Sequence, residues 1–113
     1  MTNAKRLLGR VLTEKGAYDE AEALLRDALH RYRERFGEDY PLAVRTRFFL
    51  GDVLRARGAF DEAEPLLVGS YRQYLKTQGA DSRATRTAAE SLVKLYEASG
   101  RVREAARLRA VRS

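Results

Sequence analysis

The side chains that could carry catalytic or metal chemistry are few in this sequence. Its 113 residues include one histidine, His30, and no cysteine. A zinc or iron site would therefore need carboxylates alone, and the sequence contains no such cluster. His30 is flanked by charged residues, a setting typical of a histidine at a solvated surface. We predict no metal site and no disulfide.

Acidic residues recur in two short clusters. These are Asp19-Glu20 with Glu22, and Asp61-Glu62 with Glu64. Each cluster falls in the first turn of an expected helix, where negative charge complements the helix dipole, so we interpret both as structural. Gly16, Gly58 and Gly100 stand alone and form no phosphate-binding loop. With no serine-containing elbow and no kinase signature either, the sequence predicts a protein that is not an enzyme and binds no cofactor.

An internal repeat organises the chain. Residues 8–12 return as residues 50–54, and residues 16–22 return as residues 58–64, in both cases 42 positions later. A third, shorter copy follows in the same register. It consists of Leu92, Leu95, Tyr96, Gly100, Val102, Ala105 and Leu108. Such self-similarity is the sequence signature of a repeat architecture.

Each copy contains two helical patterns. Leu8, Val11 and Leu12 recur at helical spacing and end at Gly16, while a longer pattern begins at Tyr18 and ends near Gly37. The same two patterns follow in the second copy. We expect Asp39 and the Asp81-Ser82 pair to cap the helices that begin after them. The sequence has no sustained two-residue alternation, so strands are poorly supported.

Small residues in the two patterns indicate where the helices meet. We expect backbones to approach closely at Gly9 and Gly51 on the first helices, and at Ala21, Ala63 and Ala105 on the second helices. Large residues such as Leu25 and Leu67 would fill the space around these contacts.

These residues resemble a known repeat signature. The matching positions are Leu8-Gly9, Leu12, Gly16, Ala21, Leu25 and Ala28, with Leu50-Gly51, Leu54, Gly58, Ala63 and Leu67. They are similar to the tetratricopeptide repeat (TPR), whose usual period is about 34 residues. The longer period here, with residues 36–41 and 62–66, resembles the variant of kinesin light chains and bacterial multi-repeat proteins. Residues 81–109 are similar to the C-terminal ends of repeat regions in bacterial serine/threonine kinases.

The resemblance implies an all-α fold. We expect one right-handed αα solenoid over residues 1–113, made of about three antiparallel helix pairs, or six helices. The repeats would span about residues 1–40, 41–81 and 82–113. Arg109 stands where Leu25 and Leu67 stand earlier, which predicts a polar terminal repeat. The first helix begins near Asn3, about one turn short of its counterpart, so we expect the end of a longer array or a small descendant of one.

The resemblance also implies a concave groove lined by the first helix of each pair. Its predicted residues are Asn3, Arg6, Arg10, Thr13, Arg45, Phe48, Asp52, Arg55, Thr87, Glu90, Lys94 and Glu97. Phe48 is the expected anchor for a partner side chain, because its repeat equivalents are Arg6 and Glu90. Arginines fall in the first two repeats, which favours a peptide with an acidic part. Kinesin-light-chain-like repeats commonly carry asparagines just before the Leu-Gly pair, and residues 6–7, 48–49 and 90–91 lack them.

The leading functional prediction is a cytoplasmic, bacterial scaffold that binds another protein or peptide. The net charge is +6, and residues 101–113 hold five arginines and one glutamate, a net +4. One alternative is therefore nucleic-acid binding through the arginine-rich surface, including Arg31, Arg33 and Arg35. The other is a homodimer through the N-terminal end, where Leu7, Leu8 and Leu12 would lack cover. No apolar run reaches membrane-spanning length, and no signal-peptide pattern occurs.

Overall fold

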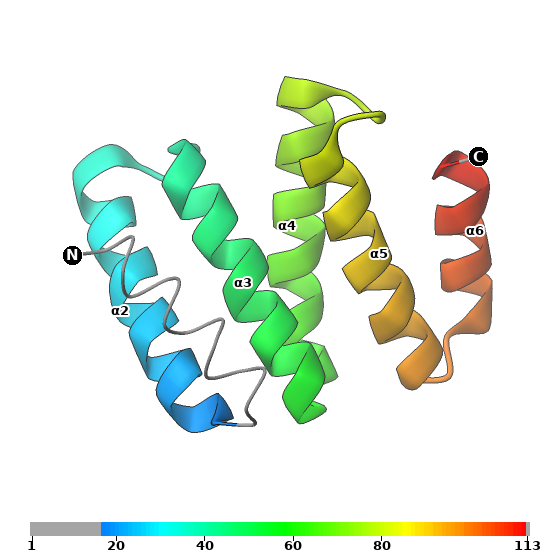
Figure 1. The fold of residues 1–113 in the computed structure, drawn as a ribbon, viewed down its shortest axis with the longest axis horizontal. Helices are drawn as coiled ribbons and strands as arrows, with labels where there is room; N and C mark the ends of the chain where they lie inside the picture. Colours follow the sequence, from blue (N-terminus) through cyan, green and yellow to red (C-terminus); the bar gives the residue numbers. More distant parts are fainter. Residues whose placement is uncertain (1–16, 113) are drawn as a thin grey trace.

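The computed structural model describes residues 17–112, and they form five α-helices. These are α2 (Tyr18–Phe36), α3 (Pro41–Arg57), α4 (Phe60–Gln78), α5 (Arg83–Ala98) and α6 (Val102–Arg112) (Figure 1). No strand occurs between residues 17 and 112, which confirms the predicted all-α class. Six helices were expected and five are described. The remaining one, expected to begin near Asn3, lies outside the described residues.

The helices form a single antiparallel series. Each described helix packs chiefly on the next one in the sequence, and successive helices run in opposite directions in Figure 1. Besides these neighbours, α3 also contacts α5. The two helices α3 and α5 therefore lie on the same side of α4, as the first helices of successive hairpins must.

Left-handed turns end the helices where the repeat places glycine. Gly58 has φ 87° and ψ 9°, and the following amide of Ala59 donates a hydrogen bond of 2.8 Å to the Leu54 carbonyl. Gly100, its equivalent, has φ 80°. A residue with a Cβ atom is strained in this region, so the predicted glycine stops are confirmed at both positions.

The two predicted helix starts differ in how they are capped. The Ser82 hydroxyl accepts a hydrogen bond of 3.1 Å from the Thr85 amide, as a capping serine should. Asp39 does not cap α3, whose N-cap residue is Tyr40 with no side-chain hydrogen bond. Pro41 at the first helical position has no amide hydrogen, so α3 has one donor fewer to satisfy.

Alternating small and large residues fill the core between the helices. Ala21, Leu25, Ala63 and Leu67 have no exposed surface. A Cβ atom placed on Gly51 would lie 2.8 Å from Leu67 Cγ, so α3 and α4 touch where only glycine fits. The predicted close approach is confirmed at this crossing, while Gly9 lies outside the described residues.

None of the five described helices combines the length and the apolar character that a membrane span requires.

Candidate protein-binding groove

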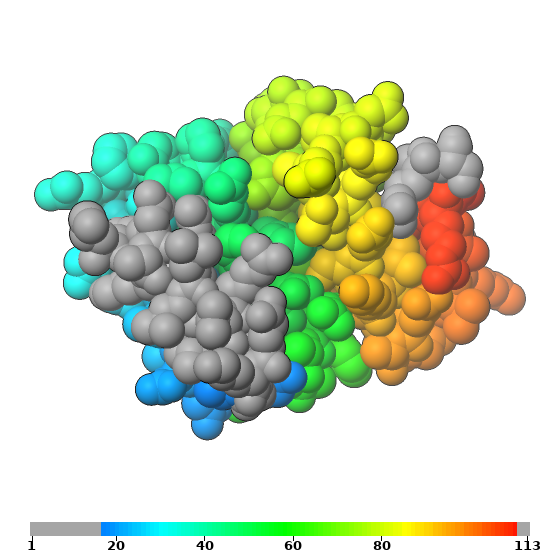
Figure 2. All heavy atoms as spheres, in the orientation of Figure 1, coloured from blue at the N-terminus to red at the C-terminus, as the bar shows by residue number. Residues whose placement is uncertain are grey.

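A hollow of about 640 Å³ lies between α3, the end of α4 and the start of α5. It brings together four predicted groove residues: Arg45, Phe48, Asp52 and Thr87. Residues that the sequence did not nominate complete the lining: Phe49, Tyr74, Gln78, Arg83 and Ala84. Figure 2 shows atoms of α3 (green) and α5 (yellow to orange) side by side on the visible face.

Not all of the predicted groove can be placed. Asn3, Arg6, Arg10 and Thr13 lie outside the described residues. Arg55, Glu90, Lys94 and Glu97 occur on α3 and α5 but do not line this hollow. The structure therefore gathers three predicted residues of α3 and one of α5 around one hollow.

Two phenylalanines form the apolar part of the lining. The ring centroids of Phe48 and Phe49 are 5.5 Å apart, with an angle of 56° between the planes. Both are half-buried, and Phe48 packs against both buried clusters of the core. Phe48 was expected to be an exposed anchor; it is partly buried, packs against the core and also reaches the hollow. Its aromatic character thus has a packing role that the repeat comparison missed.

Asp52 is held by two neighbours. The Ser91 hydroxyl on α5 donates a hydrogen bond of 2.6 Å to its carboxylate. Arg55 donates to the same carboxylate oxygen from Nε at 3.0 Å and from a terminal guanidinium nitrogen at 2.9 Å. The charges of Asp52 and Arg55 therefore compensate each other within α3, and the Ser91–Asp52 hydrogen bond joins the two helices that flank the hollow.

Arg45 and Arg83 carry the uncompensated charge at the hollow. Arg45 lies on α3 and Arg83 on α5, and both side chains are exposed. Neither forms an ion pair within residues 17–112. With Asp52 paired to Arg55, the hollow presents an aromatic surface and two guanidinium groups that lack an ion-pair partner among residues 17–112, which suits an anionic ligand with an apolar portion.

The negative end of the predicted groove is also altered by pairing. Glu97 on α5 forms an ion pair with Arg109 on α6. The predicted contrast between arginines in the first two repeats and glutamates in the third is thus weakened, since Glu97 is compensated and Arg83 adds a cation from the third repeat.

The acidic clusters form ties between neighbouring hairpins. Glu22 on α2 is 2.5 Å from Arg57 on α3, and Glu64 on α4 is 2.5 Å from Arg101, which precedes α6. Tyr96 also donates a hydrogen bond of 3.1 Å to Glu64. These partners were missed, because the clusters were interpreted through the helix dipole alone. An arginine at or just after the end of each following first helix was the sequence signal.

These contacts shift the pKa values of both carboxyl groups. Burial acts to raise the pKa of Glu22, but hydrogen bonds and charge from Arg26 and Arg57 outweigh it and lower the pKa. The Arg101 hydrogen bond is the main cause that lowers the pKa of Glu64, against partial burial. The carboxylates are stabilised in their charged form.

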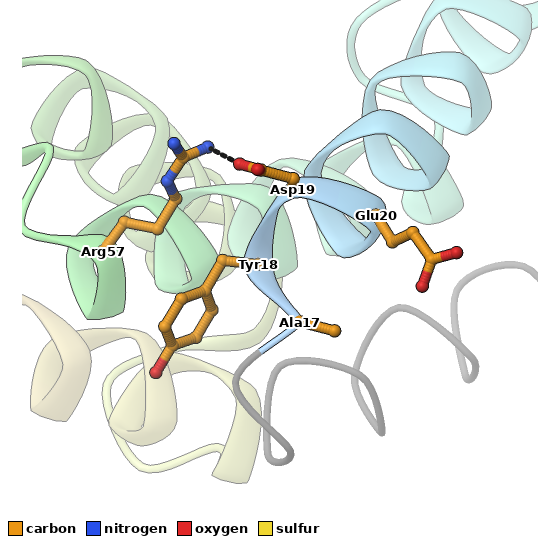
Figure 3. A pocket seen from close by; sticks show the side chains of 5 residues that line it. All are labelled: Ala17, Tyr18, Asp19, Glu20 and Arg57. Atoms are coloured by element: carbon orange, nitrogen blue, oxygen red, sulfur yellow. Dashed lines mark ion pairs between the residues drawn. The ribbon is translucent and has the colours of Figure 1, made fainter.

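The same edge of the molecule carries a shallow hollow of about 380 Å³ around Tyr18 and Arg57. Figure 3 shows the Arg57 guanidinium reaching Asp19, at 3.0 Å, while Glu20 points away from it. Arg57 thus forms ion pairs with two acidic residues of α2. We interpret the hollow as the space beside these ion pairs between α2 and α3.

Metal chemistry has no support in the described part of the chain. Within residues 17–112, no group of three or more histidine and acidic side chains is placed to hold an ion. The side chain of His30 is 70% exposed and lies 3.4 Å from Glu34, as expected of a surface histidine.

A comparison with known protein families agrees with the antiparallel helix series. A family model described as tetratricopeptide repeat matches residues 1–74. The chain belongs to the tetratricopeptide repeat family. TPR repeats generally mediate protein–protein interactions, and the fold is generally a non-catalytic scaffold. No curated protein sequence matches the chain significantly.

A solved TPR structure shows the same fold. The crystal structure of BtubC (BKLC) from P. vanneervenii is similar to this chain with a TM-score of 0.86 and 20% sequence identity. The similarity covers 95% of this chain and 42% of BtubC, so the chain spans less than half the length of that protein. The predicted kinesin-light-chain-like TPR is therefore confirmed for the fold.

Proposed function

We propose that this TPR chain is a non-catalytic scaffold that holds an acidic segment of a partner protein between α3 and α5. The observation that carries the proposal is the pair of guanidinium groups of Arg45 and Arg83, one on each of these helices, which have no ion-pair partner among the described residues and lie at a hollow with an aromatic lining. An acidic side chain would bind the arginines, and an apolar neighbour would cover Phe48 and Phe49.

We also propose that the whole chain is one right-handed solenoid of three helix pairs, with repeats at about residues 1–40, 41–81 and 82–113. Residues 1–16 would then supply the sixth helix and extend the groove through Asn3, Arg6, Arg10 and Thr13. The family match that begins at residue 1 and the 95% coverage by the BtubC similarity support this arrangement. A cytoplasmic, bacterial setting remains part of the same prediction.

Nucleic-acid binding is less supported by the charges of the described surface. Many of the arginines that favoured it are compensated by acidic residues. The pairs are Arg31 with Asp27, Arg33 with Glu38, Arg101 with Glu64, and Arg109 with Glu97. Phosphate contacts would have to displace these carboxylates.

The experiment selects ligands from random peptides displayed on phage and measures the affinity of selected peptides by fluorescence polarisation. We expect selected sequences to be rich in Asp and Glu. The double variant Arg45→Glu/Arg83→Glu should lower their affinity by at least about tenfold, because each lost charge-assisted hydrogen bond contributes about 1.5–3 kcal/mol. Arg72→Glu/Lys76→Glu is the matched control, since it makes the same change in net charge on exposed residues outside the hollow.

Equal affinity losses in the two double variants would mean that only net charge matters, and the groove would be rejected. Selected peptides without acidic residues would reject the proposed ligand chemistry.

A further inference from the structure

Phe36, the last residue of α2, is an exposed aromatic residue that no repeat role explains. Its exposed fraction is 55%, and it is the one aromatic side chain between residues 17 and 110 that is more than half exposed. Its repeat equivalent, 42 positions later, is Gln78. The TPR pattern thus accepts a polar residue here, so the repeat itself does not require an aromatic ring at this position.

The Phe36 ring packs on neighbouring aromatic rings. It stacks on Tyr40, with ring centroids 4.2 Å apart and an angle of 25° between the planes. Tyr40 in turn contacts the buried ring of Tyr32, at 5.5 Å. An exposed side chain that is already ordered loses little conformational entropy when a partner covers it.

Charged residues of both signs surround the ring. Arg31, Tyr32, Glu34, Arg35 and Phe36 line one hollow of about 360 Å³. Arg35 forms no ion pair with the described residues. Glu34 lies near His30, an imidazole that is charged only when protonated. Among the described residues, the hollow therefore offers one arginine without an ion pair, one carboxylate near a histidine and one aromatic ring.

We propose that this patch is a self-association surface, on which two copies of the chain pair around a two-fold axis. The Phe36 ring of each copy would enter the hollow of the other, and Arg35 of each would meet Glu34 of the other. A two-fold interface requires a patch that complements itself, and this one carries a projecting ring, a hollow and both charges of an ion pair. Nucleic acid fits it poorly, because Glu34 would repel phosphate.

This surface is separate from the groove of the proposed function. The patch lies on α2, whereas the groove lies between α3 and α5. It also differs from the surface around Leu7, Leu8 and Leu12 considered from the sequence, which lies outside the described residues. Pairing through Phe36 would place two grooves on one dimer, so a partner with two acidic segments would bind more tightly than a partner with one.

We expect the association to be weak. One ring and a few charged side chains cover less area than a standard interface, which places the dissociation constant at about 10 μM to 1 mM. Two chains of charge +6 also repel each other at low ionic strength. The association should therefore be measured at about 0.15 M salt, where the Debye length is about 8 Å and long-range repulsion between the chains is screened.

The test is sedimentation equilibrium of the full chain over about 10 μM to 1 mM, with circular dichroism to verify folding. The unmodified chain should dimerise in this range. Phe36→Gln should weaken dimerisation by at least about tenfold, and Gln is acceptable to the helix because Gln78 occupies the equivalent position. Val102→Gln is the control: Val102 is 65% exposed on α6, and its replacement should leave the dimer unchanged.

Charge reversal tests the proposed pairing directly. Glu34→Arg and Arg35→Glu should each weaken dimerisation, because like charges would then meet across the axis. The double variant should restore it, since the pair is re-formed with reversed signs. A chain that stays monomeric at 1 mM, an unchanged Phe36→Gln dimer, or a double variant that is not restored would each overturn the proposal. Phe36→Gln should still bind the acidic peptides of the groove, so the two proposals fail separately.

Discussion

The Ser91 hydroxyl on α5 donates a hydrogen bond of 2.6 Å to the Asp52 carboxylate on α3, and this bond joins the two helices that flank the groove. The two residues lie 39 positions apart in the sequence. Ser91 is almost fully buried, so its hydroxyl needs this acceptor. The bond fixes the spacing of α3 and α5 at the level of Asp52, next to the hollow.

Ser91→Ala should therefore lower the free energy of unfolding by about 1 kcal/mol, the usual net contribution of one hydrogen bond. The effect should stay moderate, because Arg55 still compensates Asp52. Urea unfolding followed by circular dichroism measures it. Thr77→Ala is a suitable control, since the Thr77 hydroxyl bonds only within its own helix and is exposed. Equal effects of the two changes would contradict a role between helices.

The same substitution should have opposite effects at two helical glycines. At Gly51 an added Cβ would lie 2.8 Å from Leu67 Cγ and 3.2 Å from Leu66 Cβ, so Gly51→Ala should destabilise the fold by about 1–2 kcal/mol. At Gly69 the nearest atom would be a guanidinium nitrogen of Arg47 at 3.6 Å, an ordinary contact. Gly69→Ala should stabilise the helix by about 0.5–1 kcal/mol. Thermal unfolding of both variants distinguishes these signs.

The helix starts allow a similar paired comparison. Ser82→Ala removes the hydroxyl that accepts from the Thr85 amide, and should lower stability by about 1 kcal/mol. Asp39→Ala should change it by less than about 0.5 kcal/mol, because Asp39 is exposed and caps no amide. Chemical denaturation at neutral pH measures both. A larger loss for Asp39→Ala would show that this carboxylate stabilises the start of α3 after all.

The tie between Glu64 and Arg101 predicts a pH dependence. The folded protein holds the pKa of Glu64 below its ordinary value of 4.5, so its contribution is complete above that value and is lost as the pH falls through the lowered pKa. Both side chains are partly exposed, so screening by solvent keeps the contribution small. Glu64→Gln should therefore be less stable than the unmodified chain at neutral pH, and the gap should narrow in acid. A gap independent of pH would argue against the tie.

Substitutions at Phe48 and Arg45 should distinguish effects on folding stability from effects on peptide binding. Phe48→Ala removes a ring that packs against both core clusters, and should lower stability by about 2 kcal/mol. Arg45→Glu alters an exposed side chain and should change stability by less than about 0.5 kcal/mol. The same substitution should weaken the binding of acidic peptides. Unfolding curves and peptide titrations on the same samples test this. A destabilised Arg45→Glu variant would mean that Arg45 has a structural partner.

The helical hairpins and the residues at which they touch could be predicted from the order of residues alone. The 42-residue repeat predicted the positions of helices α2 to α6. It also predicted that helices end at Gly58 and Gly100, because glycine permits a left-handed turn. The buried positions of Ala21, Ala63, Leu25 and Leu67 followed as well, because repeated small and large residues at one helical face record how neighbouring helices touch. These features depend on local geometry, which the order of residues encodes directly.

The side-chain contacts between different hairpins could not be predicted, because they depend on how the helices pack in three dimensions. Asp52 pairs with Ser91, and Glu64 with Arg101, across separations of 39 and 37 residues. Arg83 joins Arg45 at the hollow. It lies one turn before Thr87 on the same face of α5, but the predicted groove series began at Thr87. Such contacts depend on the crossing angle and spacing of helices from different hairpins, and a shift of one residue along either helix would exchange the partners.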